Sequence, residues 1–452
     1  MIKKHFASSA SISILAMTVL LAACGGGGSG STPAASGPSP AGGEQQTPPA
    51  KKDPITLTIY TEGVNKEEFD DRFLPSLTKK FPHITIEYIK AAAGTTITDL
   101  VAQNKIPDIM RIDVPGLKAK YLDLGLAYGL DELVKKNQYN LNRFDEVFIQ
   151  EMRNAGRTGE LYGLPVPPYF PLVLYYNKDL FDRFGVPYPK DGMTWDEVYE
   201  VAKKMTRVEN GLVYRGFSSS ITAMLRDNPW SLPILDPATD SLTDPEKWKT
   251  LFTTFKKFYD IPNNAMDPNL ANEGNAFGKG TVAMMANQHN IYLIIPENIN
   301  WDIVSYPMLP GSPNLMGQRG PAYWSITKQS KYKEEAFQVI TEMLSDEVQQ
   351  EDSKKGIPTT LTNKDIQKTL GASHPVYSKK NMNAVFYYPP TAPTPKRKPE
   401  LTDVPGRNQE AIIREAFNDV VLKNIDMNTA LRTADEKLKL EIAKEKAASG
   451  GK

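Results

Sequence analysis

Nucleophilic or metal chemistry in this 452-residue chain would fall to four histidines and one cysteine: His5, His83, His289, His374 and Cys24. Histidines that bind a metal often recur at short fixed spacings, as in HExxH, and no such spacing occurs here. The sequence also has no GxSxG nucleophile elbow, no P-loop and no GxGxxG that follows a strand. A single cysteine cannot form a CxxC pair. These residues therefore predict no catalytic group, no metal site and no cofactor.

Paired carboxylates are the catalytic arrangement that the sequence leaves open. A glycoside hydrolase needs two acidic side chains about 5–10 Å apart in the folded protein, and the chain contains 53 Asp and Glu residues. None of them sits in a context typical of such a pair, so they are expected on solvated surfaces and at helix caps. We predict that the protein is not an enzyme.

Cys24 stands at the end of a leader-like segment. Lys3 and Lys4 precede the apolar run Ile14–Ala23, which is too short for a membrane-spanning helix and typical of a signal peptide over residues 1–23. The sequence Leu21-Ala22-Ala23-Cys24 resembles the lipobox of bacterial lipoproteins, in which the cysteine is lipidated after cleavage. Two acyl chains, palmitate among them, would hold the protein at a membrane.

Residues 24–53 are rich in Gly, Ser, Pro and Ala, and such a composition cannot bury enough apolar surface to fold. This segment is predicted to be a flexible linker on the extracellular face of the cell membrane, in a Gram-positive host. Removal of Lys3 and Lys4 leaves 51 basic and 53 acidic side chains, a net charge of −2. That balance argues against nucleic acid as a partner.

The periodicity of apolar residues places strands and helices in alternation along the rest of the chain. Strands are expected at residues 55–60, 83–89, 106–113, 172–177, 281–285, 302–309 and 323–328. Helices are expected at residues 65–81 (divided at Pro75), at 98–104, after the capping box of Thr194 and Glu197, at 332–344 and at 411–423. The prolines of residues 387–400 predict a surface loop. The alternation predicts a two-domain α/β protein with mostly parallel sheets.

Residues 159–205 carry the most specific pattern, GELYGLPVPPYFPLVLYYNKDLFDRFGVPYPKDGMTWDEVYEVAKKM. This stretch resembles the extracellular solute-binding proteins of ABC importers, in the branch typified by maltose-binding protein, which show YGLP, YYNKDLF and TWDE segments in this order. PDIMRID before it, and AFGKGTVAMMANQHN, SYPMLPG, YWSITKQSKYKEEAFQVITEMLS and KKGIPTT after it, extend the resemblance over nearly all of residues 54–447. Residues 287–290 depart from the Gly or Trp that is usual in the family after AMM, which leaves the ligand contact there open.

The resemblance implies a two-lobe fold of the periplasmic-binding-protein type II class, with helices flanking the sheets and a cleft between the lobes. Residues 54–168 and 309–350 are assigned to lobe 1, and residues 169–308 and 351–452 to lobe 2. Ligands of open α/β sheets lie beyond the carboxyl ends of the strands. On that basis the expected ligand-binding residues are Glu62, Asp113, Tyr169, Phe170, Trp230, Asn287, Gln288, His289, Asn290, Trp324 and Arg407.

These residues combine planar polar groups with aromatic rings, a mixture that suits the hydroxyls and C–H faces of a sugar. The predicted function is a membrane-tethered receptor, monomeric, that binds a carbohydrate (an oligosaccharide) and delivers it to the membrane subunits of an ABC transporter. Two alternatives are a lipid-anchored carbohydrate-active hydrolase or lyase and a ligand-sensing accessory of a membrane kinase. Strand alternation sends one of Tyr323 and Trp324 into the core, which leaves the other for stacking on the ligand.

Overall fold

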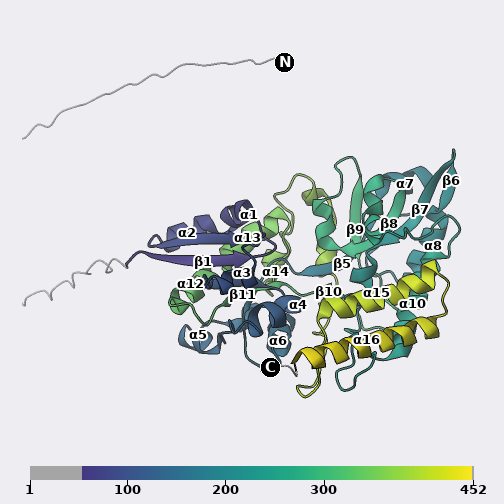
Figure 1. The fold of residues 1–452 in the computed structure, drawn as a ribbon. Helices are drawn as coiled ribbons and strands as arrows, with labels where there is room; N and C mark the ends of the chain where they lie inside the picture. Colours follow the sequence, from purple (N-terminus) through teal and green to yellow (C-terminus); the bar gives the residue numbers. More distant parts are fainter. Residues whose placement is uncertain (1–52, 450–452) are drawn as a thin grey trace, which may run out of the picture. The chain divides into compact units, whose positions relative to one another are not determined.

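The computed structural model describes residues 53–449, which contain two β-sheets (Figure 1). The first sheet has the strand order β2-β1-β3-β11-β4. Its strands are β1 Ile55–Thr61, β2 Ile84–Lys90, β3 Ile109–Ile112, β4 Leu164–Val166 and β11 Ala322–Ile326. Strand β1 pairs in parallel with β2 and β3, whereas β11 runs antiparallel between β3 and β4. Strand β11, from late in the chain, thus joins a sheet whose other strands all come from the first part of the chain.

The helices beside the first sheet come from an early part of the chain and from a later part that follows β11. They are α1 Lys66–Arg72, α2 Leu74–Lys80, α3 Ile97–Ala102, α4 Val114–Leu117, α5 Asp131–Lys136, α6 Glu146–Ala155, α12 Lys333–Met343, α13 Asp346–Lys355 and α14 Lys364–Gln367. Pro75 lies in the first turn of α2, where a missing N–H costs nothing, and it follows the end of α1. The predicted division of the 65–81 helix is confirmed.

The second sheet has the strand order β10-β5-β8-β7-β6, and β9 also pairs with β5. Its strands are β5 Phe170–Asn177, β6 Arg207–Glu209, β7 Leu212–Ser219, β8 Val282–Gln288, β9 Trp301–Ser305 and β10 Gln318–Arg319. Its helices are α7 Lys178–Phe184, α8 Trp195–Met205, α9 Ile221–Arg226, α10 Pro245–Tyr259, α11 Leu270–Asn275, α15 Gly406–Leu422 and α16 Met427–Ser449. The capping box predicted at the start of α8 is present, because Thr194 and Glu197 satisfy each other's backbone N–H groups.

The expectation of mostly parallel sheets is wrong. Three of the nine strand pairings among the described residues are parallel, namely β1–β2, β1–β3 and β7–β8. The strands that join the sheets from distant parts of the chain, β9, β10 and β11, all pair antiparallel. The periodicity of single segments predicts strands but not the direction in which a distant strand returns.

Each sheet has its own hydrophobic core. The core in which a residue packs indicates the lobe to which that residue belongs. Leu309 packs in the core of the second sheet, and β10 extends that sheet to Arg319. Leu361 and Ile366 pack in the core of the first sheet. The predicted bounds placed 309–319 in lobe 1 and 351–367 in lobe 2, and these contacts correct both assignments. We propose crossings near residue 320 and after residue 367 instead.

The proline-rich segment 387–400 forms neither helix nor strand, but it is not simply a surface loop. Arg397 is buried, and its guanidinium donates to the carbonyl oxygens of Asp236 at 2.6 Å and Thr239 at 2.7 Å and pairs with Asp240. Thr391 is also buried. These anchors fix the loop against the second half of the molecule.

Candidate functional site

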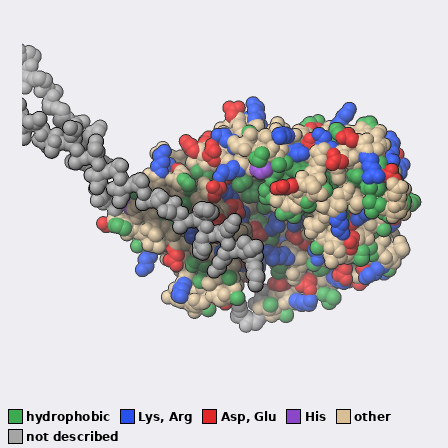
Figure 2. Space-filling model, turned by 90° about the horizontal axis from the view of Figure 1, so that it is seen from above, with side chains coloured by type: hydrophobic (Ala, Val, Ile, Leu, Met, Phe, Trp, Pro, Cys, Tyr) green, Lys and Arg blue, Asp and Glu red, His purple; other side chains and the backbone are tan. Residues whose placement is uncertain are grey.

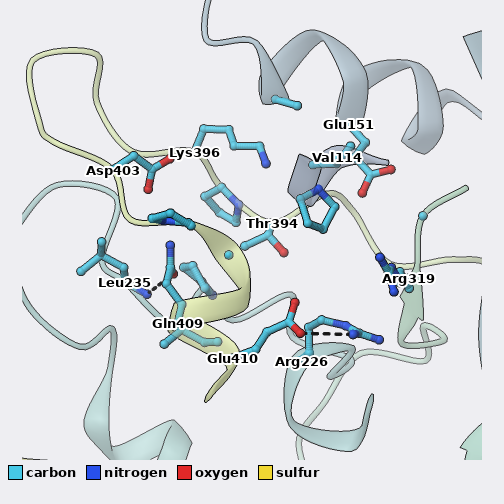
Figure 3. A pocket seen from close by; sticks show the side chains of 18 of the residues that line it. Val114, Glu151, Arg226, Leu235, Arg319, Thr394, Lys396, Asp403, Gln409 and Glu410 are labelled. Carbon is cyan, nitrogen blue, oxygen red and sulfur yellow. Dashed lines mark hydrogen bonds and ion pairs between the residues drawn. The ribbon is translucent and has the colours of Figure 1, made fainter. Parts of the chain in front are cut away.

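Two adjoining cavities meet at Asp113, which follows β3. The first encloses about 270 Å³ and is lined from both halves of the molecule: by α4 and α6 beside the first sheet, and by α9, the start of α15 and loop 394–405 beside the second (Figure 3). The second encloses about 290 Å³. Its lining residues are Tyr60, Glu62, Gly63, Met110, Arg111, Ile112, Asp113, Lys120 and Arg407.

Asp113 links the two halves of the molecule electrostatically. Its Oδ1 accepts the backbone N–H of Gly116 at 3.0 Å and so caps α4, while its Oδ2 pairs with Arg319 at 2.7 Å. Arg319 belongs to β10 of the second sheet. Asp113, which follows a strand of the first sheet, thereby forms an ion pair with Arg319 of the second sheet.

Glu62 follows β1 and forms the acidic side of the second cavity. Its carboxylate pairs with Lys120 and accepts the hydroxyl of Tyr60 at 3.4 Å. Burial, reinforced by the charge of Glu62, raises the pKa of Tyr60 to about 12. Tyr60 therefore stays protonated and acts as a hydrogen-bond donor at neutral pH.

Arg111 lies in the middle of β3, opposite Trp324 of β11. Its Nε is enclosed without a hydrogen-bond partner, and none of its guanidinium nitrogens bonds or pairs with another of residues 53–449. A side chain at Gly63 would begin only 3.3 Å from Arg111 Nη1, so glycine leaves room for the guanidinium there. Burial, followed by repulsion from Arg72, lowers the pKa of Arg111 to about 10, which still leaves it charged at neutral pH.

Glu151 of α6 and Lys396 of the proline-rich loop both line the first cavity (Figure 3). Burial raises the pKa of Glu151, although the hydroxyl of Tyr323 donates to its Oε2 at 2.6 Å. Burial lowers the pKa of Lys396, and the nearby Glu151 opposes that shift. A Cβ at Gly320 would lie 1.9 Å from Glu151 Oε2, so a side chain at this position would force the carboxyl group to move.

Arg226, at the end of α9, organises the opposite wall of the first cavity. It pairs with Asp227 at 2.5 Å and with Glu410 of α15 at 3.5 Å (Figure 3). Asp227 also accepts the amide of Gln288 at 3.3 Å. The wall is thus a charged network that is already satisfied within the protein.

Four of the residues predicted from the sequence lie at these cavities. Glu62, Asp113 and Arg407 line them directly, and Gln288 reaches the first cavity through Asp227. No aromatic side chain of the described residues lines the first cavity, and Tyr60 alone does so at the second. The structure thus brings four predicted polar residues together at the cavities, but none of the predicted aromatic residues.

Two predicted stacking residues lie in the interior instead. Trp324 has no exposed surface and meets Phe73 edge-on at 6.2 Å in the first core. Tyr169 is buried between Phe148 and Met316, where the chain passes from one sheet to the other. A ring with no free face cannot stack on a sugar, so the structure corrects both assignments.

The segment after β8 is also more enclosed than expected. Asn287 is buried and donates to the carbonyl of Gly274 at 3.2 Å. His289 is buried as well and lines neither cavity, and burial lowers its pKa to about 3, so it is neutral at physiological pH. Asn290, Phe170 and Trp230 are half-buried and line neither cavity.

The sequence interpretation missed several charged residues that line the cavities: Arg111, Lys120, Glu151, Arg226, Asp227 and Lys396. A signal existed for Arg111, because it is a charged residue inside the otherwise apolar strand IMRI. Lys396 was hidden in a segment predicted to be a surface loop. Glu151 and Asp227 carry no sequence signal, because only the packing of distant elements brings them to the cavity.

Other predictions concern metals, membranes and surface charge. The predicted signal peptide, Cys24 and the linker up to residue 52 lie outside the described residues. Within residues 53–449, no cluster of three or more His, Cys, Asp or Glu is placed to hold a metal ion, and no helix has the length and apolar character of a membrane span. Figure 2 shows acidic and basic side chains interspersed over the coloured part of the face in view.

Comparison with known proteins identifies relatives by sequence. Residues 59–350 match the family described as bacterial extracellular solute-binding protein. A curated relative, an uncharacterised ABC transporter extracellular-binding protein of Pyrococcus horikoshii, is 26% identical over 163 residues. That match spans 34% of this chain and only 34% of the relative's length.

Solved structures share the fold at low sequence identity. A sugar transporter of Rhizobium etli in an open conformation has a TM-score of 0.69 at 20% identity, over 85% of this chain and 99% of its own. An ABC substrate-binding protein of Listeria monocytogenes in complex with cycloalternan has a TM-score of 0.63 at 19% identity, over 86% and 100%. The maltose/maltodextrin-binding domain of Bdellovibrio bacteriovorus bound to maltotriose has a TM-score of 0.61 at 17% identity, over 86% and 100%. The predicted two-lobe α/β fold is confirmed.

Proposed function

Because the chain belongs to the family of bacterial extracellular solute-binding proteins, we propose that it binds a carbohydrate outside the cell and delivers it to the membrane subunits of an ABC importer. The observation that carries this proposal is the pair of polar cavities joined at Asp113, the first of them lined from both halves of the molecule. A ligand held between two lobes favours the arrangement in which both contact it. The proteins of the same fold that bind cycloalternan and maltotriose support a carbohydrate as the ligand class.

The site is built for binding rather than for turnover. Arg226 pairs with Asp227 and Glu410, and Arg319 pairs with Asp113, and such fixed partners can orient the hydroxyl groups of a ligand. A screen of mono- and oligosaccharides by thermal shift tests the ligand class, since a ligand that binds only the folded state raises the melting temperature. Chromatography of the recovered sugar separates the receptor from a hydrolase or lyase, which would return cleaved products.

Obstruction of the first cavity should abolish the response in that screen. Gly406 lines this cavity, and no heavy atom lies within 4 Å of the position that a Cβ would take there. Gly406→Phe is therefore expected to fit its backbone while its ring fills the cavity. We expect sugar affinity to fall roughly tenfold or more, because a blocked pocket loses its contacts with the ligand, at an unchanged ligand-free melting temperature.

Gly274→Phe is the matched control for this substitution. Gly274 likewise has open space around its Cβ position, but it lines a separate cavity beside α11 and β8. This variant should bind sugar as the unmodified protein does. Equal affinities in the two variants, measured by calorimetry, would place the ligand outside the first cavity and contradict the proposal.

We also propose that the protein is a monomeric lipoprotein of the extracellular membrane face, tethered through Cys24 by the linker of residues 24–53. The lipobox-like sequence at residues 21–24 supports this proposal. Mass spectrometry of the N-terminal peptide of the mature protein should detect a diacylglyceryl-modified Cys24. Detection of an unmodified cysteine, or of a mature chain that begins after it, would refute the anchor and leave the binding function intact.

A further inference from the structure

Two cations of the second cavity, Arg111 and Arg407, form no hydrogen bond or ion pair with another described residue, and Arg407 is exposed whereas Arg111 is half-buried. The two acidic residues of this cavity are already engaged, Glu62 with Lys120 and Asp113 with Arg319 at 2.7 Å. Arg111 has no hydrogen bond or ion pair with any other described residue, and its Nε is enclosed. A charge that is partly enclosed without a partner is costly, and such groups cluster at functional sites.

The charged groups behind Arg111 cannot supply that partner. Arg72 lies close enough to repel it, and the fully buried Arg72 uses Glu68 at 2.8 Å, Asp352 at 2.8 Å and the carbonyl of Pro167 at 2.9 Å. Glu68 attracts Arg111 but is itself held by Arg72. Asp113 of the cavity lining also attracts Arg111 but is held by Arg319, so there is room for a further counter-charge on the cavity side.

The cavity lining sets the sign of that counter-charge. Its cations are Arg111, Lys120 and Arg407, its anions are Glu62 and Asp113, and Arg319 pairs with Asp113 from beside the lining, so positive charge is in excess. An anionic ligand balances this excess. A planar guanidinium binds a planar carboxylate through two parallel hydrogen bonds.

The lining offers little to a neutral sugar ring. Tyr60 is its only aromatic residue among those described, and its hydroxyl is held by Glu62 while it accepts the N–H of Ile97 at 3.1 Å. We propose that the second cavity binds the carboxylate of an acidic sugar, a uronic acid unit, and that Arg111 is the residue that selects it. This inference rests on the proposed carbohydrate-binding function and narrows its substrate class.

Calorimetry with matched acids and esters tests the inference. The probes are mono- to trisaccharides of galacturonate, glucuronate and mannuronate, each beside its methyl ester, which keeps every ring hydroxyl and removes the charge. At least one acid should bind, and its ester should bind roughly tenfold to a hundredfold more weakly, as the loss of a charge-assisted hydrogen-bond pair predicts. Neutral and sulfated oligosaccharides complete the panel.

Three outcomes would overturn the inference. If a neutral or sulfated sugar binds while no uronate does, or if acid and ester bind equally, the cavity does not select a carboxylate and the carbohydrate function still stands. If no sugar of any kind binds, the proposed function fails and the inference fails with it.

Substitutions at Arg111 assign the selectivity to this side chain. Arg111→Met should remove most of the preference for acid over ester, and Arg111→Lys should keep part of it because the charge remains. Arg153→Met is the control, since Arg153 pairs with Asp131 on the first half of the molecule away from both cavities. A preference unchanged in Arg111→Met would contradict the assignment.

The ligand-free melting temperature provides a second readout for Arg111→Met. Because the guanidinium has no protein partner, its replacement by an apolar side chain of similar length should leave this temperature unchanged or raise it. A large fall would mean that Arg111 serves the fold. If Arg111→Met does not fold, the acid-to-ester ratio in Arg111→Lys decides the assignment.

Discussion

Replacement of Trp324 by alanine is expected to lower the free energy of unfolding by about 3–5 kcal/mol, the usual cost of removing a large aromatic side chain from a core. Trp324 has no exposed surface, and β11 is paired on both sides, with β3 and with β4. The cavity left by the indole could not be filled without moving Phe73 or the strands themselves. Urea unfolding followed by far-ultraviolet circular dichroism measures the loss.

Trp230→Ala is the comparison for that measurement. Trp230 is only half-buried and packs at the margin of the second core, so its removal should cost clearly less. If Trp324→Ala instead keeps its stability and loses sugar affinity, the indole faces a ligand and the core assignment is wrong.

Replacement of Asp352 by alanine is expected to cost about 3–5 kcal/mol of unfolding free energy, because it removes the buried partner of Arg72 and leaves that charge with the partly exposed Glu68. Arg72 of α1 and Asp352 of α13 are both buried and pair at 2.8 Å, and the same guanidinium also donates to Pro167 O at 2.9 Å. The pair therefore joins two helices of the first half to the segment that leads toward the second sheet. Urea unfolding of the ligand-free protein is again the measurement.

The double variant Arg72→Met, Asp352→Leu isolates the cause of that loss. It removes both charges together, so most of the lost stability should return. Asp70→Ala provides the surface control: it breaks an exposed pair with Lys66, which is worth about 0–1 kcal/mol. Equal costs for Asp352→Ala and Asp70→Ala would show that the buried pair contributes no more than an exposed one.

Local pattern was sufficient to predict most secondary-structure elements. Strand alternation found β1, β2 and β5, and the Thr194–Glu197 spacing found the start of α8, because these signals lie within a few neighbouring residues. Strand alternation failed at Tyr323 and Trp324, because it predicted that only one of them is in the core and both are fully buried. Alternation assigns one inward face only when the other face meets solvent, and a strand in the middle of a covered sheet has no such face.

The candidate site was predictable only where a residue directly follows a strand. Glu62 and Asp113 were found in that way, and both lie at the cavities. Arg319 reaches Asp113 from 206 residues further along the chain, and Lys396 reaches the region of Glu151 from a loop without regular structure. Such long-range contacts depend on how the two sheets and their connecting segments pack, and no short stretch of sequence predicts that packing.

The position of β11 between β3 and β4 also sets an order for folding during synthesis. Translation proceeds from the N-terminus, so every residue between Val166 and Ala322 is made before the central partner of these two strands exists. Until then β3 has one open edge and β4 has no neighbouring strand, and open edges are sites where chains aggregate. Closure of such long-range pairings is slow. A nascent chain arrested before residue 322 is therefore the species most in need of a chaperone.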